Sequence, residues 1–303
     1  MKAIVPVVMD LLNLVNNTHN HWRSLGGWTI EFYDYVVLGY TAHLDEPNTK
    51  RLEAMVDAYF YRDGPNMRRL PKLVVNGGND EFFLPDDTKA WWRGLPGENH
   101  RLMIPNADHG LRFCDPATCR TTDNFTSARN DVFNGTRKFM AATTSFVYMI
   151  ARDMQRPSFD WRIEHHPEDR SATISLIDLS EQPASVTVWV ATTKDGVRRD
   201  FRLINCGKAL DGVCASEDDI DVNPREYMPH EVLPGRHGVW MSSIAAPAVG
   251  WAAFFLEVRF RPPVAGLPPF QATTEAIVVP DEYPFGDCHS NSCTDSCGTL
   301  QLV

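Results

Sequence analysis

The sequence contains no G-x-S-x-G nucleophile elbow, no apolar run of the roughly 18 to 20 residues needed to span a membrane, and no stripe of basic residues. Its 303 residues carry a formal net charge of −10, and the 29 Lys and Arg residues are scattered along the chain. Because nucleic acids and anionic membranes are bound by clustered cations, both are disfavoured as partners. With 43% hydrophobic and 22% charged residues, the composition is that of an ordinary globular protein.

The first residues lack the marks of a secretory leader. Lys2 is followed by an apolar stretch that Asp10 interrupts, and no A-x-A-like cleavage site comes after it. We interpret residues 2–8 as a buried strand. Because a core strand at the very start needs neighbours, we expect the chain to be the C-terminal portion of a longer protein, without that protein's signal peptide.

Glycosylation sequons and closely spaced cysteines indicate a secreted parent protein, since short Cys spacings are typical of local disulfides in loops. The sequons place acceptors at Asn16, Asn124 and Asn134. The seven cysteines form three groups: Cys114 and Cys119, Cys206 and Cys214, and Cys288, Cys293 and Cys297. We predict a disulfide within each of the first two groups and leave the pairing of the third open. The alternative is a set of unpaired cytosolic thiols.

Residues 1–155 have the pattern of an α/β domain. Apolar strands at 72–76 and 100–104 alternate with helical patterns at 46–61 and 124–153, and Asp86 has the character of a helix cap before Trp91 and Trp92. The 46–61 segment is expected to bury its apolar face. Pro157 then ends the last helix.

Residues 158–280 change to a strand-rich pattern. The strand-like segments are 172–179, 185–193, 251–259 and 270–279. Their alternation predicts a small antiparallel β-sandwich packed on the first domain. Residues 281–303 form a Cys-rich tail.

Two residues in the α/β part carry the strongest chemical signal. Asp80 follows the strand at 72–76 through Gly77 and Gly78, and His109 follows the strand at 100–104. In α/β-hydrolases the triad acid and base occur in this order, each after a strand, and the acid orients the imidazole that activates the nucleophile. Taken singly, Asp80 is better interpreted as a turn residue and His109 as an exposed loop residue. Taken together, they predict a catalytic pair without its serine.

Four segments resemble the PhoPQ-activated pathogenicity-related family, and they lie at 5–10, 21–28, 76–85 and 105–111. The resemblance implies the C-terminal half of an α/β-hydrolase fold, with Asp80 and His109 at the family's acid and base positions. It also implies a secreted parent whose elbow serine lies upstream.

Other polar groups predict no metal site and no cofactor. His165 and His166 are neighbours on a strand and point to opposite faces, and the acidic run 217–221 lacks an EF-hand pattern. The spacing of Cys288, Cys293 and Cys297 around His289 fits no zinc motif, so disulfides are preferred there. The aromatic stretch 22–40 is interpreted as core rather than as a substrate cap.

Two functions stay open on the sequence alone. The first is a serine hydrolase of the peptidase or esterase type, acting on a peptide or ester substrate in the intact parent, with this chain inactive by itself. The second is a secreted signalling or binding protein of the autocrine proliferation repressor type, which uses the same scaffold to engage a cell-surface receptor. Fold alone does not choose between them.

Overall fold

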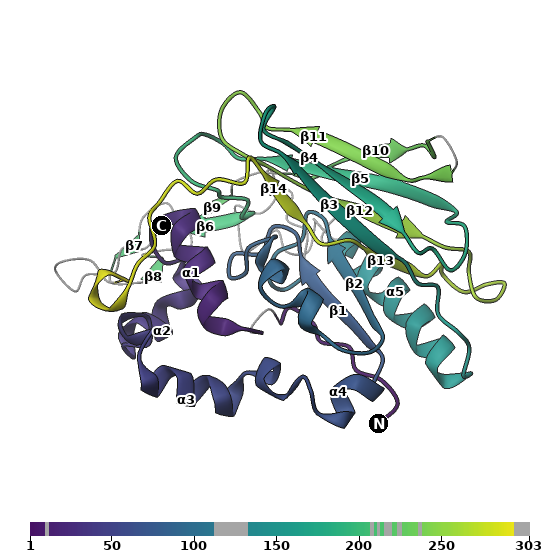
Figure 1. Ribbon diagram of the computed structural model, residues 1–303, viewed down its shortest axis with the longest axis horizontal. Helices are drawn as coiled ribbons and strands as arrows, with labels where there is room; N and C mark the ends of the chain where they lie inside the picture. The colour runs from purple at the N-terminus through teal and green to yellow at the C-terminus, as the bar shows by residue number, and fades with distance from the viewer. Residues whose placement is uncertain are drawn as a thin grey trace.

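The computed structural model (Figure 1) is a mixed α/β structure with several sheets. It describes residues 1–9, 12–111, 133–206, 209–210, 213–214, 220–222, 226–235 and 238–293. Among these residues, no helix has the length and apolar character needed to cross a membrane.

Two parallel strands form the centre of the N-terminal half. β1 (Lys72–Gly77) and β2 (Asn99–Ile104) pair over six residues each, and β1 is buried throughout. Apolar runs suit strands covered on both faces, which is why these two were predictable. The segment predicted as a strand at 2–8 makes only two bridges to β1, at Ile4 and Val7, because Pro6 between them has no N–H to donate.

Among the described residues, four α-helices precede β1 and one follows β2. They are α1 (Leu14–Leu25), α2 (Tyr33–Val37), α3 (Pro47–Val56), α4 (Pro65–Arg69) and α5 (Phe133–Ala151). Single 3-10 turns lie between them at η1 (Ile30–Phe32), η2 (Thr41–His43) and η3 (Ala58–Tyr61). Residues 124–132, predicted to begin the last helix, lie outside the described residues.

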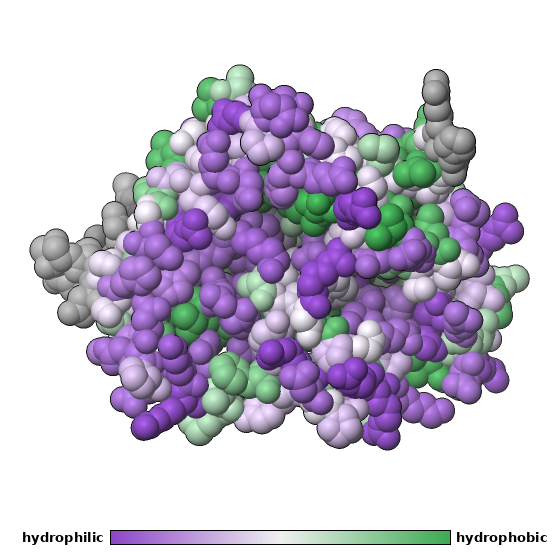
Figure 2. Space-filling model, in the orientation of Figure 1, coloured by the Kyte–Doolittle hydropathy of each residue, from purple (hydrophilic) through white to green (hydrophobic). Residues whose placement is uncertain are grey.

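The expected burial of the apolar face at 46–61 is wrong. α3 buries Thr49 and Glu53, while Met55 is 70% exposed, and Figure 2 shows apolar surface along the lower edge of the molecule where α3 lies. The reason is electrostatic. A carboxylate oxygen of Glu53 accepts from the N–H of Val15 at 3.0 Å and one of Asp57 accepts from the N–H of Leu14 at 3.0 Å. These carboxylates satisfy the open N–H groups at the start of α1.

The predicted helix through Trp91 and Trp92 is instead two 3-10 turns, η4 (Asp87–Ala90) and η5 (Trp92–Gly94). The two carboxylate oxygens of Asp87 accept from Leu84 N–H at 2.9 Å and from the Asn20 amide at 2.7 Å. Trp91 then takes φ −147° and ψ −22°, which is outside helical geometry. Both Trp side chains are buried.

The C-terminal half contains two main antiparallel sheets. One has the order β11–β4–β3, from Met241–Ala245, Ser171–Ile177 and Asp160–His166. The other has the order β10–β5–β12–β13, with β14 also paired to β12, from Met228–Val232, Ser185–Thr192, Ala252–Arg259, Gln271–Thr273 and Ile277–Val279. Two short ribbons pair β6 (Ile204–Cys206) with β9 (Ile220–Val222) and β7 (Ala209–Leu210) with β8 (Val213–Cys214). Three of the four predicted strand segments are confirmed as β4, β5 and β12, whereas the fourth, 270–279, is divided into β13 and β14.

One hydrophobic core joins the two halves. It combines side chains of β1, β2 and α5 with inward-facing residues of β4, β5 and β12. β13 lies beside β2, where the N–H of Met103 donates to Thr273 Oγ1 at 2.9 Å. Lys138 of α5 pairs with the buried Glu257 of β12 at 2.7 Å. The strand-rich half therefore packs tightly on the parallel pair, and it fixes the loops that leave β1 and β2.

Candidate active site

The loops that follow β1 and β2 are locked together by their backbones. Asn79 N–H donates to Ala107 O at 3.1 Å, and Asn106 N–H donates to Asn79 Oδ1 at 3.1 Å. A Cβ atom at Gly77 would lie 2.6 Å from the carbonyl oxygens of both Ala107 and Asp108, closer than real Cβ atoms approach. Glycine at position 77 is therefore what allows the two loops to meet.

Asp80 and His109 stand at the ends of these loops, and their side chains are in contact. His109 Nδ1 lies 3.0 Å from Asp80 Oδ2 and 3.1 Å from Oδ1. The Asp80 side chain is 1% exposed, and that of His109 is 33% exposed. Asp80 Oδ1 also accepts the backbone N–H groups of Phe82 and Phe83, at 2.7 and 3.1 Å, so the carboxylate is fixed in place. The strand order of the sequence predicted this proximity; a catalytic role stays a prediction.

The surroundings of the pair raise the pKa values of His109 and of the neighbouring Glu81. The hydrogen bond to Asp80 raises the pKa of His109, although partial burial opposes this. Glu81 accepts the backbone N–H of His109 at 3.0 Å, and burial, followed by the charge of Asp80, raises the pKa of the Glu81 carboxyl to about 7. A histidine and a carboxyl group whose pKa values are both raised thus lie side by side, and perturbed pKa values are common at functional sites.

The free edge of the imidazole is the chemically available part. With Nδ1 held by Asp80, Nε2 has no hydrogen-bond partner among the described residues, and no Ser, Thr or Cys side chain in that part of the chain bonds to His109. Ser24, a serine whose surroundings lack an elbow pattern, is buried elsewhere and accepts from Arg199. The contact with Asp80 therefore leaves Nε2 of an oriented imidazole without a nucleophile bound to it among the described residues.

An aromatic cluster lies next to the pair. It consists of Trp22, Trp28, Phe32, Tyr35, Tyr40 and Phe82. Trp28 and Phe32 are 1% and 4% exposed, so the core interpretation of stretch 22–40 holds for them. His21 stacks on Trp28, and burial lowers the pKa of His21 to about 3, which keeps it neutral. Phe82 continues the cluster to His109, with ring centres 5.6 Å apart.

The remaining predicted modification sites are only partly visible. Asn16 is exposed on α1. Asn124 and the first cysteine pair, Cys114 and Cys119, lie outside the described residues. The side chains of Asn134, Cys206 and Cys214 lie outside them as well, although their backbones belong to α5, β6 and β8. In the tail, Cys288 forms a disulfide with Cys293.

Sequence reasoning missed the acidic surroundings of His109. Glu81 directly follows Asp80, but nothing in the sequence shows that it turns back to the His109 backbone. Glu31, on η1, interacts electrostatically with both Asp80 and His109. It comes from a segment 78 positions before His109, and no motif links the two.

Comparison with known proteins identifies the class to which this arrangement belongs. The family described as PhoPQ-activated pathogenicity-related protein matches residues 1–202, and the chain belongs to this family. It is similar to autocrine proliferation repressor protein A of Dictyostelium discoideum, with 30% identity over 97% of this chain. The match covers 54% of that relative, so the chain spans about half of its length.

Proposed function

We propose that Asp80 and His109 are the acid and base of a serine-hydrolase triad of the peptidase or esterase type. The observation that supports this is the bidentate contact between the Asp80 carboxylate and His109 Nδ1. It orients the ring and leaves Nε2 on a side chain that solvent reaches. In such triads the carboxylate stabilises the imidazolium that forms when Nε2 takes the nucleophile's proton.

We also propose a more specific fold for each half of the chain. The N-terminal half of this chain corresponds to the last part of an α/β-hydrolase sheet, its C-terminal half. The strand-rich half of this chain is a β-sandwich. The parallel order of β1 and β2, with an acid after one and a histidine after the other, supports the assignment of the N-terminal half. We further propose that the parent is secreted and glycosylated, supported by the exposed side chain of Asn16 and the tail disulfide.

The nucleophile and oxyanion hole would come from residues of a longer parent protein. The Dictyostelium relative is about twice as long as the region that this chain matches, which supports a parent of that kind. This 303-residue chain alone should then show no esterase activity, because a base without a positioned nucleophile supplies little of the rate enhancement. The test is hydrolysis of p-nitrophenyl esters by the chain beside a His109→Ala variant. Turnover by the chain that this substitution abolishes would contradict the missing-nucleophile proposal.

The triad assignment is tested on the longer parent. His109→Ala and Asp80→Asn should each reduce kcat/KM by about 10³-fold or more with folding intact, whereas His165→Ala, at an exposed histidine of β3, serves as a matched control. Equal activity of the parent and its His109→Ala variant would remove the triad assignment.

A second candidate function rests on the similarity to a relative named as a proliferation repressor. In this alternative, the scaffold binds a cell-surface receptor and hydrolysis plays no part. The discriminating assay adds parent protein and its His109→Ala variant to proliferating cells. Repression that both proteins produce equally supports the binding function, and repression lost with His109 supports hydrolysis.

A further inference from the structure

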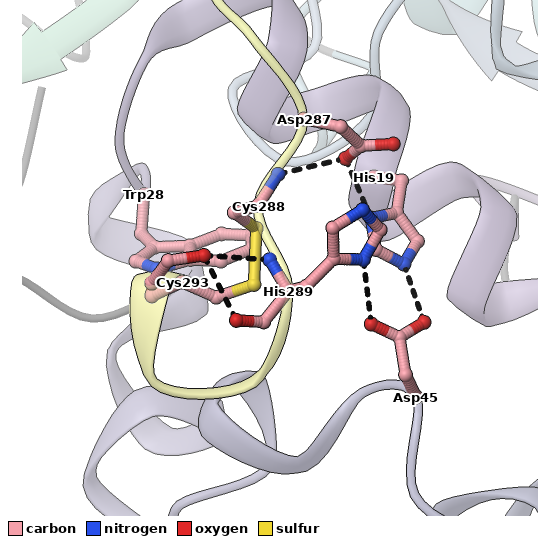
Figure 3. The surroundings of a disulfide bond; sticks show 8 residues. His19, Trp28, Asp45, Asp287, Cys288, His289 and Cys293 are labelled. Carbon is pink, nitrogen blue, oxygen red and sulfur yellow. Dashed lines mark hydrogen bonds and ion pairs between the residues drawn. A yellow bond between two sulfur atoms is a disulfide. The ribbon is translucent and has the colours of Figure 1, made fainter.

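Four polar residues from three distant segments converge near the tail disulfide (Figure 3). His19 Nε2 lies 3.1 Å from Asp45 Oδ1, and His289 Nδ1 lies 3.0 Å from Asp45 Oδ2. His19 Nδ1 lies 2.8 Å from Asp287 Oδ1. His19 belongs to α1, Asp45 precedes α3, and the other two belong to the tail. One ligand atom from each of His19, Asp45 and His289 lies within 4.8 Å of the others.

The two carboxylates make different demands on His19. In the tautomer whose Nδ1–H donates to Asp287 Oδ1, the lone pair of Nε2 faces Asp45. A lone pair that faces a carboxylate is repulsive unless a cation lies between them. A carboxylate on the outer nitrogen of a histidine is the arrangement that orients histidine ligands in metal sites.

We propose that His19 Nε2, Asp45 and His289 Nδ1 bind a divalent transition metal of the zinc type, with Asp287 positioning His19. Tetrahedral zinc with bonds of 2.0–2.2 Å separates neighbouring ligand atoms by about 3.4 Å. His19 Nε2 and His289 Nδ1 lie 3.1 and 3.0 Å from the two different carboxylate oxygens of Asp45, so each imidazole nitrogen is within a few tenths of an ångström of this separation from the carboxylate. Two imidazoles and one carboxylate suit zinc better than magnesium or calcium, which prefer oxygen ligands. Water completes the coordination.

Covalent and packing restraints hold the ligands of the tail. The Cys288–Cys293 disulfide closes a short loop around His289, and Trp28 Nε1 donates to Cys293 O at 2.7 Å (Figure 3). Because Cys288 is in the disulfide, it is not a thiolate ligand. The His19 side chain is 13% exposed and those of Asp45 and His289 are 39% and 70% exposed, so an ion has access from solvent. The metal would fasten the tail to α1.

The chain offers a matched control. His43 Nδ1 lies 2.8 Å from Glu46 Oε1 on the surface, so it has a carboxylate partner but no third ligand. Free thiols of the 303-residue chain are alkylated first, and zinc binding is measured by equilibrium dialysis at pH 7.5. We expect one zinc ion per chain, bound at least tenfold more weakly by His289→Gln and about tenfold more weakly by Asp287→Asn. His43→Gln should bind as the unchanged chain does.

Thermal unfolding in EDTA and in zinc separates metal binding from folding. In EDTA the chain and His289→Gln should unfold at the same temperature, and zinc should raise the midpoint of the chain alone. Magnesium should raise neither. Zinc binding that His289→Gln and Asp287→Asn leave unchanged, or a chain that takes up no zinc, would overturn the proposal. The cluster would then be a set of imidazolium–carboxylate pairs.

Discussion

The buried ion pair between Arg199 and Asp86 should be the most costly polar interaction to break. Arg199 Nη2 lies 2.9 Å from Asp86 Oδ2, with the two side chains 2% and 7% exposed. Lys89 reaches the same oxygen at 2.7 Å but is 42% exposed. Removing one partner of a buried pair typically costs 3–5 kcal/mol, because the other charge stays buried. Since Lys89 remains beside Asp86, we expect Arg199→Met to cost about 3 kcal/mol.

The assay is thermal unfolding followed by circular dichroism. At about 2.1 cal/mol/K per residue, a 303-residue chain has an unfolding entropy of about 0.6 kcal/mol/K, so a loss of about 3 kcal/mol lowers Tm by about 5 °C. Lys89→Met should lower it by less than 2 °C, because the lysine side chain is partly exposed and Arg199 still pairs with Asp86. Adding Asp86→Leu to Arg199→Met should recover part of the loss, because it removes the buried carboxylate whose arginine partner is gone. A drop below 1 °C for Arg199→Met would refute the reasoning.

Three further variants test the site and its supports. As the pH rises from 4.5 to 7, the chain should lose at most about 3 kcal/mol of unfolding free energy, because a carboxyl with a pKa raised to about 7 favours folding only while protonated. Glu81→Gln should remove this loss. Urea titrations in which the chain and the variant lose the same stability across this pH window would contradict the prediction. Gly77→Ala should cost about 1–3 kcal/mol by pushing the two loops apart, whereas Gly286→Ala, which meets no atom within 4 Å, should be neutral in the same unfolding assay. Asp57→Ala should cost about 1–2 kcal/mol by exposing the start of α1, and equal midpoints for it and the exposed Asp63→Ala would count against this capping role.

The elements that could be predicted are those whose sequence signal is local and strong. The apolar runs of β1, β2 and β12 predict buried strands directly, because strands buried on both faces have apolar residues in succession instead of an alternation of polar and apolar residues. Asp80 and His109 were predictable for a related reason. Each directly follows one of two consecutive parallel strands, and such strands end at the same edge of a sheet.

What could not be predicted depends on partners far away in the sequence. The polar side of α3 turns inward because Glu53 meets the start of α1, and α1 carries no mark of that need. The metal-type cluster draws on His19, Asp45 and His289, and the last two are 244 positions apart. Spacing rules for zinc ligands describe single loops, so a site assembled by folding escapes them.

The contact between Trp28 and Cys293 has a consequence for the order of events during synthesis. The two residues are 265 positions apart, and a ribosome adding 5–20 residues per second needs roughly 15 to 50 s to cover that interval. During this time the indole N–H has no acceptor from the tail, and the aromatic side chains around it lack their cover. The layer around Trp28 is thus completed only when the tail has been made, and a nascent chain stopped short of the tail would present that aromatic surface to chaperones.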